Sequence, residues 1–221
     1  MAKKYTAEQA RRLILDTSTR LFVEKGYEKT SIQDIVRELD GLSKGAVYHH
    51  FKSKDDIIEA VVRRFLLKEE ELAGIVALPN KNGLEKIQEL MFQTMFNSDL
   101  GGTRDLSFSL LENPKFFALY VLSNNEVMAP LIEKCLIEGN EDGSVNVSQP
   151  KQSAELSLLI VSTWFIPALF PNTVETFMDK LKAASTILEQ AGMPILNEEM
   201  MTRLMNEIER KAAELNEQAK K

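Results

Sequence analysis

The feature that most constrains this chain is a pair of short helical patterns between residues 30 and 54. Thr30 and Ser31 are residues of the kind that cap a helix N-terminus. The apolar residues after them recur at helical spacing and predict one buried face: Ile32, Ile35, Val36 and Leu39. Asp40-Gly41 ends that pattern, and Ser43 caps a second one with an inward side of Leu42, Val47 and Phe51. Two short helices joined by a glycine-containing turn predict a helix-turn-helix, whose second helix enters the DNA major groove.

The run from Ser43 to Phe51, SKGAVYHHF, followed by Ser53-Lys54, resembles the signature of the TetR (tetracycline-repressor-like) family of transcription regulators. A helix over Ala10–Gly26 and the stretch Thr30–Asp34 are similar to the first and second helices of that family. The resemblance covers roughly residues 6 to 66. The Asp40-Gly41-Leu42 turn is one residue longer than the commonest version, a difference that bears on the tilt of the second helix.

The resemblance implies an all-α fold, with a three-helix helix-turn-helix domain followed by a helical bundle for ligand binding and dimerisation. We expect the DNA-binding domain over 1–54, the larger domain over 55–221, and a fourth helix from residue 53 as the linker. Apolar periodicity and breaks at Gly and Pro predict about nine or ten helices in all. Outside the helix-turn-helix, they are expected over 6–25, 53–75, 84–97, 104–112, 115–138, 151–169, 173–191 and from Asn197 onward. The 53–75 helix is expected to move as one rod.

The distribution of charge agrees with a DNA-binding head on a separate body. The chain has a net charge of −6. Residues 1–54 carry 11 Lys and Arg against 7 Asp and Glu, a net of +4, whereas residues 55–221 carry a net of −10. A basic head concentrates phosphate affinity, and an acidic body repels DNA.

Several side chains of the helix-turn-helix have the chemistry that DNA contacts require. Lys44 can donate to guanine or phosphate, Ala46 can touch a thymine methyl group, and Gln33 can read adenine. Gly45 would let the backbone approach DNA closely. The resemblance makes Tyr48 a phosphate-binding residue. Further phosphate candidates are Thr30, Ser31, His49 and Lys54, the last at the amide-rich start of a helix.

The body is rich in Met and aromatic residues, whose ordinary interpretation is core packing. Collectively they also suit an apolar ligand pocket, and the resemblance implies one for an unidentified small-molecule effector. The ligand-binding candidates are Met91, Met95, Phe108, Phe117, Tyr120 and Trp164. The 151–169 helix is apolar on several faces, so we expect a homodimer through it and the next helix. The dimerisation candidates are Leu158, Phe165, Phe177, Leu181 and Leu188.

These observations favour a ligand-responsive regulator, more a repressor than an activator, that binds palindromic double-stranded operator DNA. An alternative keeps the fold but holds a protein partner and has no effector. An enzyme is disfavoured because no nucleophile, phosphate loop or catalytic pair is evident. No metal or cofactor is expected, since His49 and His50 point to different faces of a helix and lack further ligands. A cytoplasmic location without a membrane span is expected, because no signal peptide is evident and Cys135 is the single cysteine.

Overall fold

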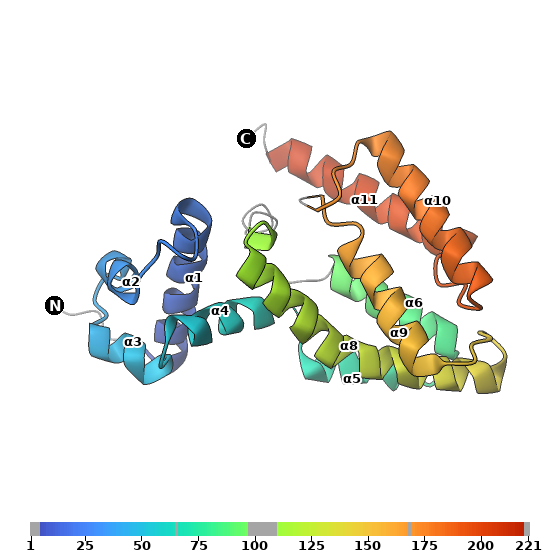
Figure 1. Ribbon diagram of the computed structural model, residues 1–221, viewed down its shortest axis with the longest axis horizontal. Coiled ribbons are helices and arrows are strands. Elements are labelled where there is room, and N and C mark those ends of the chain that lie inside the picture. Colours follow the sequence, from blue (N-terminus) through green and yellow to red (C-terminus); the bar gives the residue numbers. More distant parts are fainter. Residues whose placement is uncertain (1–4, 65, 97–109, 168, 219–221) are drawn as a thin grey trace. The chain divides into compact units, whose positions relative to one another are not determined.

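A computed structural model of the protein describes residues 5–64, 66–96, 110–167 and 169–218. Within these ranges every regular element is a helix, which confirms the all-α prediction (Figure 1). The chain forms two compact units, each made of two segments. The first unit comprises residues 1–66 and 100–123, and the second comprises 67–99 and 124–221. Within the described part of the chain, no helical segment combines the length and apolarity that a bilayer crossing needs.

The first unit contains four consecutive helices and the start of a fifth. These are α1 (Ala7–Lys25), α2 (Ile32–Glu38), α3 (Lys44–His50), α4 (Lys54–Arg63) and the first turns of α8 (Pro114–Asp142). Thr6 and Gln9 form a capping box at the start of α1. Helix α1 contacts both α2 and α4, and α2 contacts α3. The core is built from side chains of all these helices, among them Ile14, Leu21, Ile35, Val47, Ile57, Ile58 and Phe116, each fully buried.

The second unit contains the remaining described helices and most of α8. They are α5 (Glu69–Val76), α6 (Gly83–Phe96), α9 (Pro150–Leu158), the short π-helix η1 (Leu159–Thr163), α10 (Val174–Gln190) and α11 (Glu198–Gln218). One continuous apolar core joins them. Helices α6 and α8 approach closely, since a Cβ on Gly83 would lie 2.3 Å from the Cys135 carbonyl oxygen. Glycine is therefore required at the start of α6.

The predicted helix over 53–75 is two helices, so the expectation of a single rod was wrong. Helix α4 ends at Arg63 and α5 begins at Glu69. Lys68 has an extended backbone, and its amide donates to the Glu71 carboxylate. Three glutamates fill the first turn of α5, where negative charge is stabilised by the helix dipole. The charge pattern therefore starts a new helix although the apolar spacing continues.

The helix predicted over 151–169 also ends early. It changes into η1 at Leu159 and leaves helical structure after Thr163, where the Trp164 amide donates to the Leu159 carbonyl five residues back. A π-turn is a common form of irregularity inside helices. The remaining boundaries agree more closely: α6, α10 and α11 lie where expected, and α8 runs four residues beyond residue 138. The helix predicted over 104–112 falls largely outside the described residues.

The single cysteine lies on α8 in the core of the second unit. Cys135 is fully buried, and that burial raises the pKa of its thiol to about 11. The thiol is therefore protonated at neutral pH and is a poor nucleophile. A packing role accounts for its position among apolar side chains.

Helices α6 and α11 are joined by a partly buried ion pair, in which Glu89 is the more buried partner. The Arg203 guanidinium donates to both oxygens of Glu89, at 2.9 and 3.3 Å, and Gln93 donates to the same carboxylate. The Arg203 guanidinium also lies 3.6 Å from the centroid of the Phe92 ring. These interactions, chiefly the bond from Arg203, lower the pKa of Glu89 below its ordinary value of 4.5. The charged pair therefore stabilises the fold above that pH, and its contribution falls as pH drops through the lowered pKa.

We expect Glu89→Gln to destabilise the second unit by about 1–2 kcal/mol at pH 7, because a charge-assisted hydrogen bond is lost. The difference from the wild type should shrink as the pH falls through the lowered pKa of Glu89, where Glu89 itself becomes protonated. Urea unfolding followed by the fluorescence of Trp164, the single tryptophan, measures both. The matched control is Glu214→Gln in the exposed pair with Arg210, expected to change stability by less than about 0.5 kcal/mol. An equal effect of the two substitutions would contradict the prediction.

Candidate DNA-binding site

Helices α2 and α3 are both fixed at their N-termini by serine. The Ser31 hydroxyl accepts from the Asp34 amide at 3.1 Å, and Asp34 in turn accepts from the Ser31 amide at 2.9 Å. Hydrogen bonds from Ser31 lower the pKa of Asp34. The Ser43 hydroxyl accepts from the Ala46 amide at 3.2 Å. Between the helices Gly41 has a φ of 79°, a conformation that favours glycine. The predicted helix-turn-helix is confirmed.

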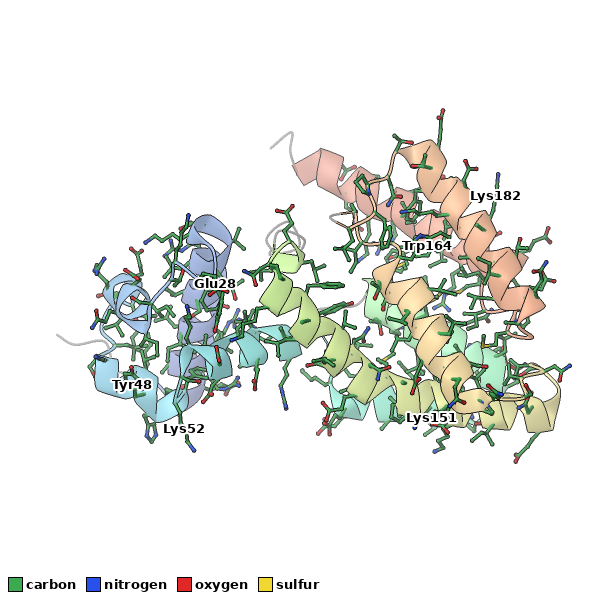
Figure 2. The ribbon with its side chains drawn as sticks, viewed as in Figure 1. Glu28, Tyr48, Lys52, Lys151, Trp164 and Lys182 are labelled. Carbon is green, nitrogen blue, oxygen red and sulfur yellow. The ribbon has the colours of Figure 1, made fainter. Side chains whose placement is uncertain are left out.

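The outward side of α3 carries the residues expected to face DNA. Lys44, Gly45, Tyr48 and His49 are exposed, and Ala46 is half-buried. Tyr48, labelled in Figure 2, is 44 % exposed although it is a large aromatic residue. The Lys44 ammonium lies 5.8 Å from the centroid of its ring, within range of a cation–π interaction. Gln33 is exposed on α2. Opposite them Val47 is fully buried, so α3 presents one polar face and one core face.

Gly45 is not required by the protein's own packing. A Cβ built there would have only the Ser43 hydroxyl within 4 Å, at 3.7 Å. Its φ also lies outside the left-handed region, since the positive-φ glycines are 26, 41, 143 and 192. A larger residue would fit the isolated fold. The exposed backbone at this point of α3 is therefore open to a close approach from outside.

Thr30 does not belong to the contact set that the sequence suggested. It is buried, and its hydroxyl donates to the Gly26 carbonyl at 2.8 Å and lies 3.2 Å from that of Leu21. The side chain joins the end of α1 to the start of α2 and is inaccessible to phosphate. Ser31 is exposed, but its amide and its hydroxyl both donate to Asp34. Its role in the fold is that of a cap.

Lys54 is half-buried and points toward Tyr27. Its ammonium donates to the Tyr27 carbonyl at 2.7 Å and lies 4.1 Å from the centroid of the Tyr27 ring. The cation therefore braces the start of α4 against the turn before α2. Lys52, also labelled in Figure 2, is exposed just after α3. The sequence analysis did not include Lys52 among the phosphate candidates. Its position directly after α3, between Phe51 and Ser53, is the signal that could have included it.

Known proteins share this part of the chain. Residues 14–61 match the sequence profile described as "Bacterial regulatory proteins, tetR family". The HTH-type transcriptional repressor Rv1474c of Mycobacterium tuberculosis is 31% identical over 107 residues, which are 48% of this chain and 54% of that protein. The match therefore spans about half the length of that relative. The HTH-type transcriptional repressor AcnR of Corynebacterium efficiens is 27% identical over 161 residues, 72% of this chain and 81% of AcnR.

A solved structure extends the similarity to the whole fold. NalD of Pseudomonas aeruginosa, described as the secondary repressor of the MexAB-OprM multidrug efflux pump, has a TM-score of 0.64 to this chain. It is 19% identical, and the match covers 87% of this chain and all of that one. Residues 14–61 are therefore similar to the DNA-binding domain of the TetR family, and the fold as a whole is similar to that of a solved repressor. The resemblance carried by Ser43–Lys54 is thereby confirmed, together with the fold class that it implied.

The ligand-binding candidates of this chain are divided between the two units. Met91, Met95 and Trp164 belong to the core of the second unit or pack against it. Phe117 and Tyr120 lie on the part of α8 that belongs to the first unit. Burial raises the pKa of the Tyr120 hydroxyl. Phe108 lies outside the described residues. Three of the six candidates therefore belong to the second unit and two to the first.

The dimerisation candidates need a correction, because three of the five are core residues of a single chain. Leu158, Leu181 and Leu188 are buried within the second unit, so they are unavailable to a second subunit while the fold is intact. Phe165 and Phe177 are half-buried and meet edge to face at 5.6 Å. Apolar side chains that are exposed on the same helices are Leu156 (50 %), Leu159 (48 %) and Ile187 (45 %).

We expect Tyr48→Phe to weaken DNA binding a few-fold on every sequence, because a hydroxyl that contacts phosphate carries no sequence information. If Lys44 contacts a base, Lys44→Ala should also lower the preference for the best site by about 1–3 kcal/mol. Binding of matched and mismatched duplexes, measured by fluorescence anisotropy, separates the two effects. Lys182→Ala on α10 removes the same charge from the second unit and serves as the control. If the Tyr48→Ala/Lys44→Ala double variant binds DNA with wild-type affinity, the assignment of α3 as the DNA-binding site is wrong.

Proposed function

We propose that the protein is a ligand-responsive transcription regulator that represses transcription by binding a palindromic operator and leaves it when a small molecule binds. The observation that carries the proposal is the exposed face of α3, where Lys44, Gly45 and Tyr48 lie opposite the buried Val47. The Tyr48 hydroxyl can donate a hydrogen bond to a DNA phosphate, and the exposed Lys44 ammonium can donate to a phosphate or to a base edge. The operator and its repressor would meet in the cytoplasm.

The dimer that a palindrome requires is proposed to form through α9, η1 and α10. Leu156, Leu159 and Ile187 are large apolar residues about half exposed on these helices. Leu156 and Leu159 are three residues apart and so lie on one side of the same helical segment. Apolar side chains exposed together favour a protein–protein contact. These three replace the buried leucines of the sequence prediction. The alternative of a module that holds a different protein would use the same side chains but would leave the face of α3 without a role.

The effector is proposed to be a largely apolar molecule that carries at least one hydrogen-bond donor. Asn124 on α8 is 2 % exposed, and its Oδ1 accepts no hydrogen bond from any residue that the structure describes. One turn later on the same face, Met128 is part of the apolar core. A buried carbonyl oxygen without a donor costs about 1–3 kcal/mol. A ligand that supplies the donor would recover that cost.

We expect two chains to bind one palindromic duplex, with the recognition helices about 34–36 Å apart in the complex. DNA from beside the protein's own gene is the first duplex to test by gel shift. A duplex with one half-site scrambled should bind much more weakly, because it engages the recognition helix of only one of the two chains. Equal binding of both duplexes would contradict the dimeric mode.

The control for that experiment removes the proposed dimer surface. The variant Leu156→Glu/Ile187→Glu should sediment as a monomer and bind the intact palindrome no better than the half-site. Leu122→Glu, at a 67 % exposed position of α8, introduces the same charge elsewhere and should remain dimeric. If the double variant is still a dimer, the assignment of the dimer surface is wrong, while the proposal of DNA binding stands.

We further expect compounds that raise the melting temperature of the protein to carry a hydrogen-bond donor on an apolar body, and to weaken operator binding about 5–150-fold. Operator DNA must lower the affinity of the protein for the compound by the same factor, since coupling is reciprocal. Calorimetric titration of a hit with and without the duplex measures this. Asn124→Leu should lose affinity for donor-bearing hits more than for analogues lacking the donor. Equal affinity for a hit in both titrations would rule out release by that compound.

A further inference from the structure

One lysine that is far from the helix-turn-helix in the sequence belongs to the same compact unit. Lys115, in the first turn of α8, has its ammonium 2.5 Å from the Asp55 carboxylate and 4.9 Å from the centroid of the Tyr27 ring. The Tyr27 hydroxyl donates to the same oxygen of Asp55. Lys54 lies over the same ring. We call Tyr27, Asp55 and Lys115 the clamp.

Each member of the clamp belongs to a different part of the first unit. Tyr27 follows Gly26 in the turn before α2, is 3 % exposed, and packs edge to face on Phe22 of α1 at 5.2 Å. Asp55 lies in the first turn of α4, immediately after the segment that follows the recognition helix. The clamp therefore joins the segments on both sides of the helix-turn-helix to the start of α8.

The clamp is charged at neutral pH. Lys115, and next the Tyr27 hydroxyl, lower the pKa of Asp55, while Asp55 raises the pKa of Lys115. Burial, and then Asp55, raise the pKa of Tyr27, so its hydroxyl keeps the proton that it donates. The ion pair is thus present throughout the pH range in which DNA would be bound.

Lys115 is held in a fixed position by its own helix. The Asn113 side chain accepts from the amides of Lys115 and Phe116 at 3.0 and 3.1 Å, which caps α8. The Phe116 side chain is fully buried in the first unit. The ammonium is therefore presented from a capped and anchored turn, so less conformational entropy is lost when it meets Asp55.

We propose that Lys115 is a positioning residue for DNA recognition: through Asp55 and Tyr27 it holds the start of α4 against the turn before α2, and so sets the position of the recognition helix. The proposal rests on the function proposed above. It differs from a direct role, because Lys115 acts through two residues that themselves need not touch DNA. It also lies outside residues 14–61, the part that matches the family profile.

Two substitutions with opposite effects on charge test the proposal. Lys115→Met removes a positive charge and Asp55→Asn removes a negative one. If charge alone matters, the first should weaken DNA binding and the second should strengthen it. If the clamp positions α4, both should weaken binding, by about three- to fivefold for a partly exposed pair. The double variant should then be no weaker than either single variant.

The measurement is fluorescence anisotropy of the full chain with a duplex that the wild type selects from a random pool, over a series of salt concentrations. The slope of log affinity against log salt should be unchanged in Lys115→Met, whereas loss of a direct phosphate contact would reduce it by about one. Lys115→Arg should restore affinity, because it keeps the cation beside Asp55. Lys134→Met, at an exposed position on the same helix, is the matched control and should bind like the wild type.

The outcomes separate the two proposals. Failure of the wild type to select or bind any duplex would overturn the proposed function and this inference with it. Normal binding by the wild type, with unchanged binding by Lys115→Met and Asp55→Asn, would overturn the inference alone. Tighter binding by Asp55→Asn, additive effects or a reduced salt slope would also overturn it. Circular dichroism and melting temperature of each variant show that the helices are retained in the comparison.

Discussion

Three serine hydroxyl groups hold the short helices on which the DNA-binding unit depends. Ser31, Ser43 and Ser53 each accept a hydrogen bond from the amide three residues later, at 3.1, 3.2 and 3.0 Å. Helices α2 and α3 have only seven residues each, well below the roughly 12–15 residues at which an isolated helix becomes marginally stable. Capping and the burial of one apolar face must therefore act together, and they leave the opposite face of α3 free for a ligand.

This dependence on local signals explains why the first unit could be predicted from the sequence. A cap residue, an apolar stripe and a glycine turn lie within a few residues of one another, so the pattern around Ser43 determines which face of α3 is buried. Thr30 shows the limit of local sequence patterns. A threonine before a helix can cap it or turn inward, and the choice depends on the carbonyls at the end of α1, which the local sequence does not reveal.

The second unit was predicted less completely, because its details depend on long-range packing. Apolar periodicity identified its helices, but it could not distinguish Leu181 and Leu188, which face the core, from Ile187, which faces outward. All three lie on a helix with apolar residues on more than one side. Which side meets the core is decided by the neighbouring helices. Periodicity also continued across residues 64–68, where the three glutamates of α5 begin a new helix.

The chain passes from one unit to the other between α4 and α5, and again within α8. A single helix through residues 53–75 would have joined the two units as one rod, whereas α4 ends at Arg63 and α5 begins at Glu69. Helix α8 instead runs without interruption from Pro114 to Asp142, past the point at residue 124 where the second unit begins. Pro130 removes one hydrogen bond from it and leaves it helical. The proposed ligand contact at Asn124 and the clamp residue Lys115 therefore lie on one continuous helix, which contributes residues to both units.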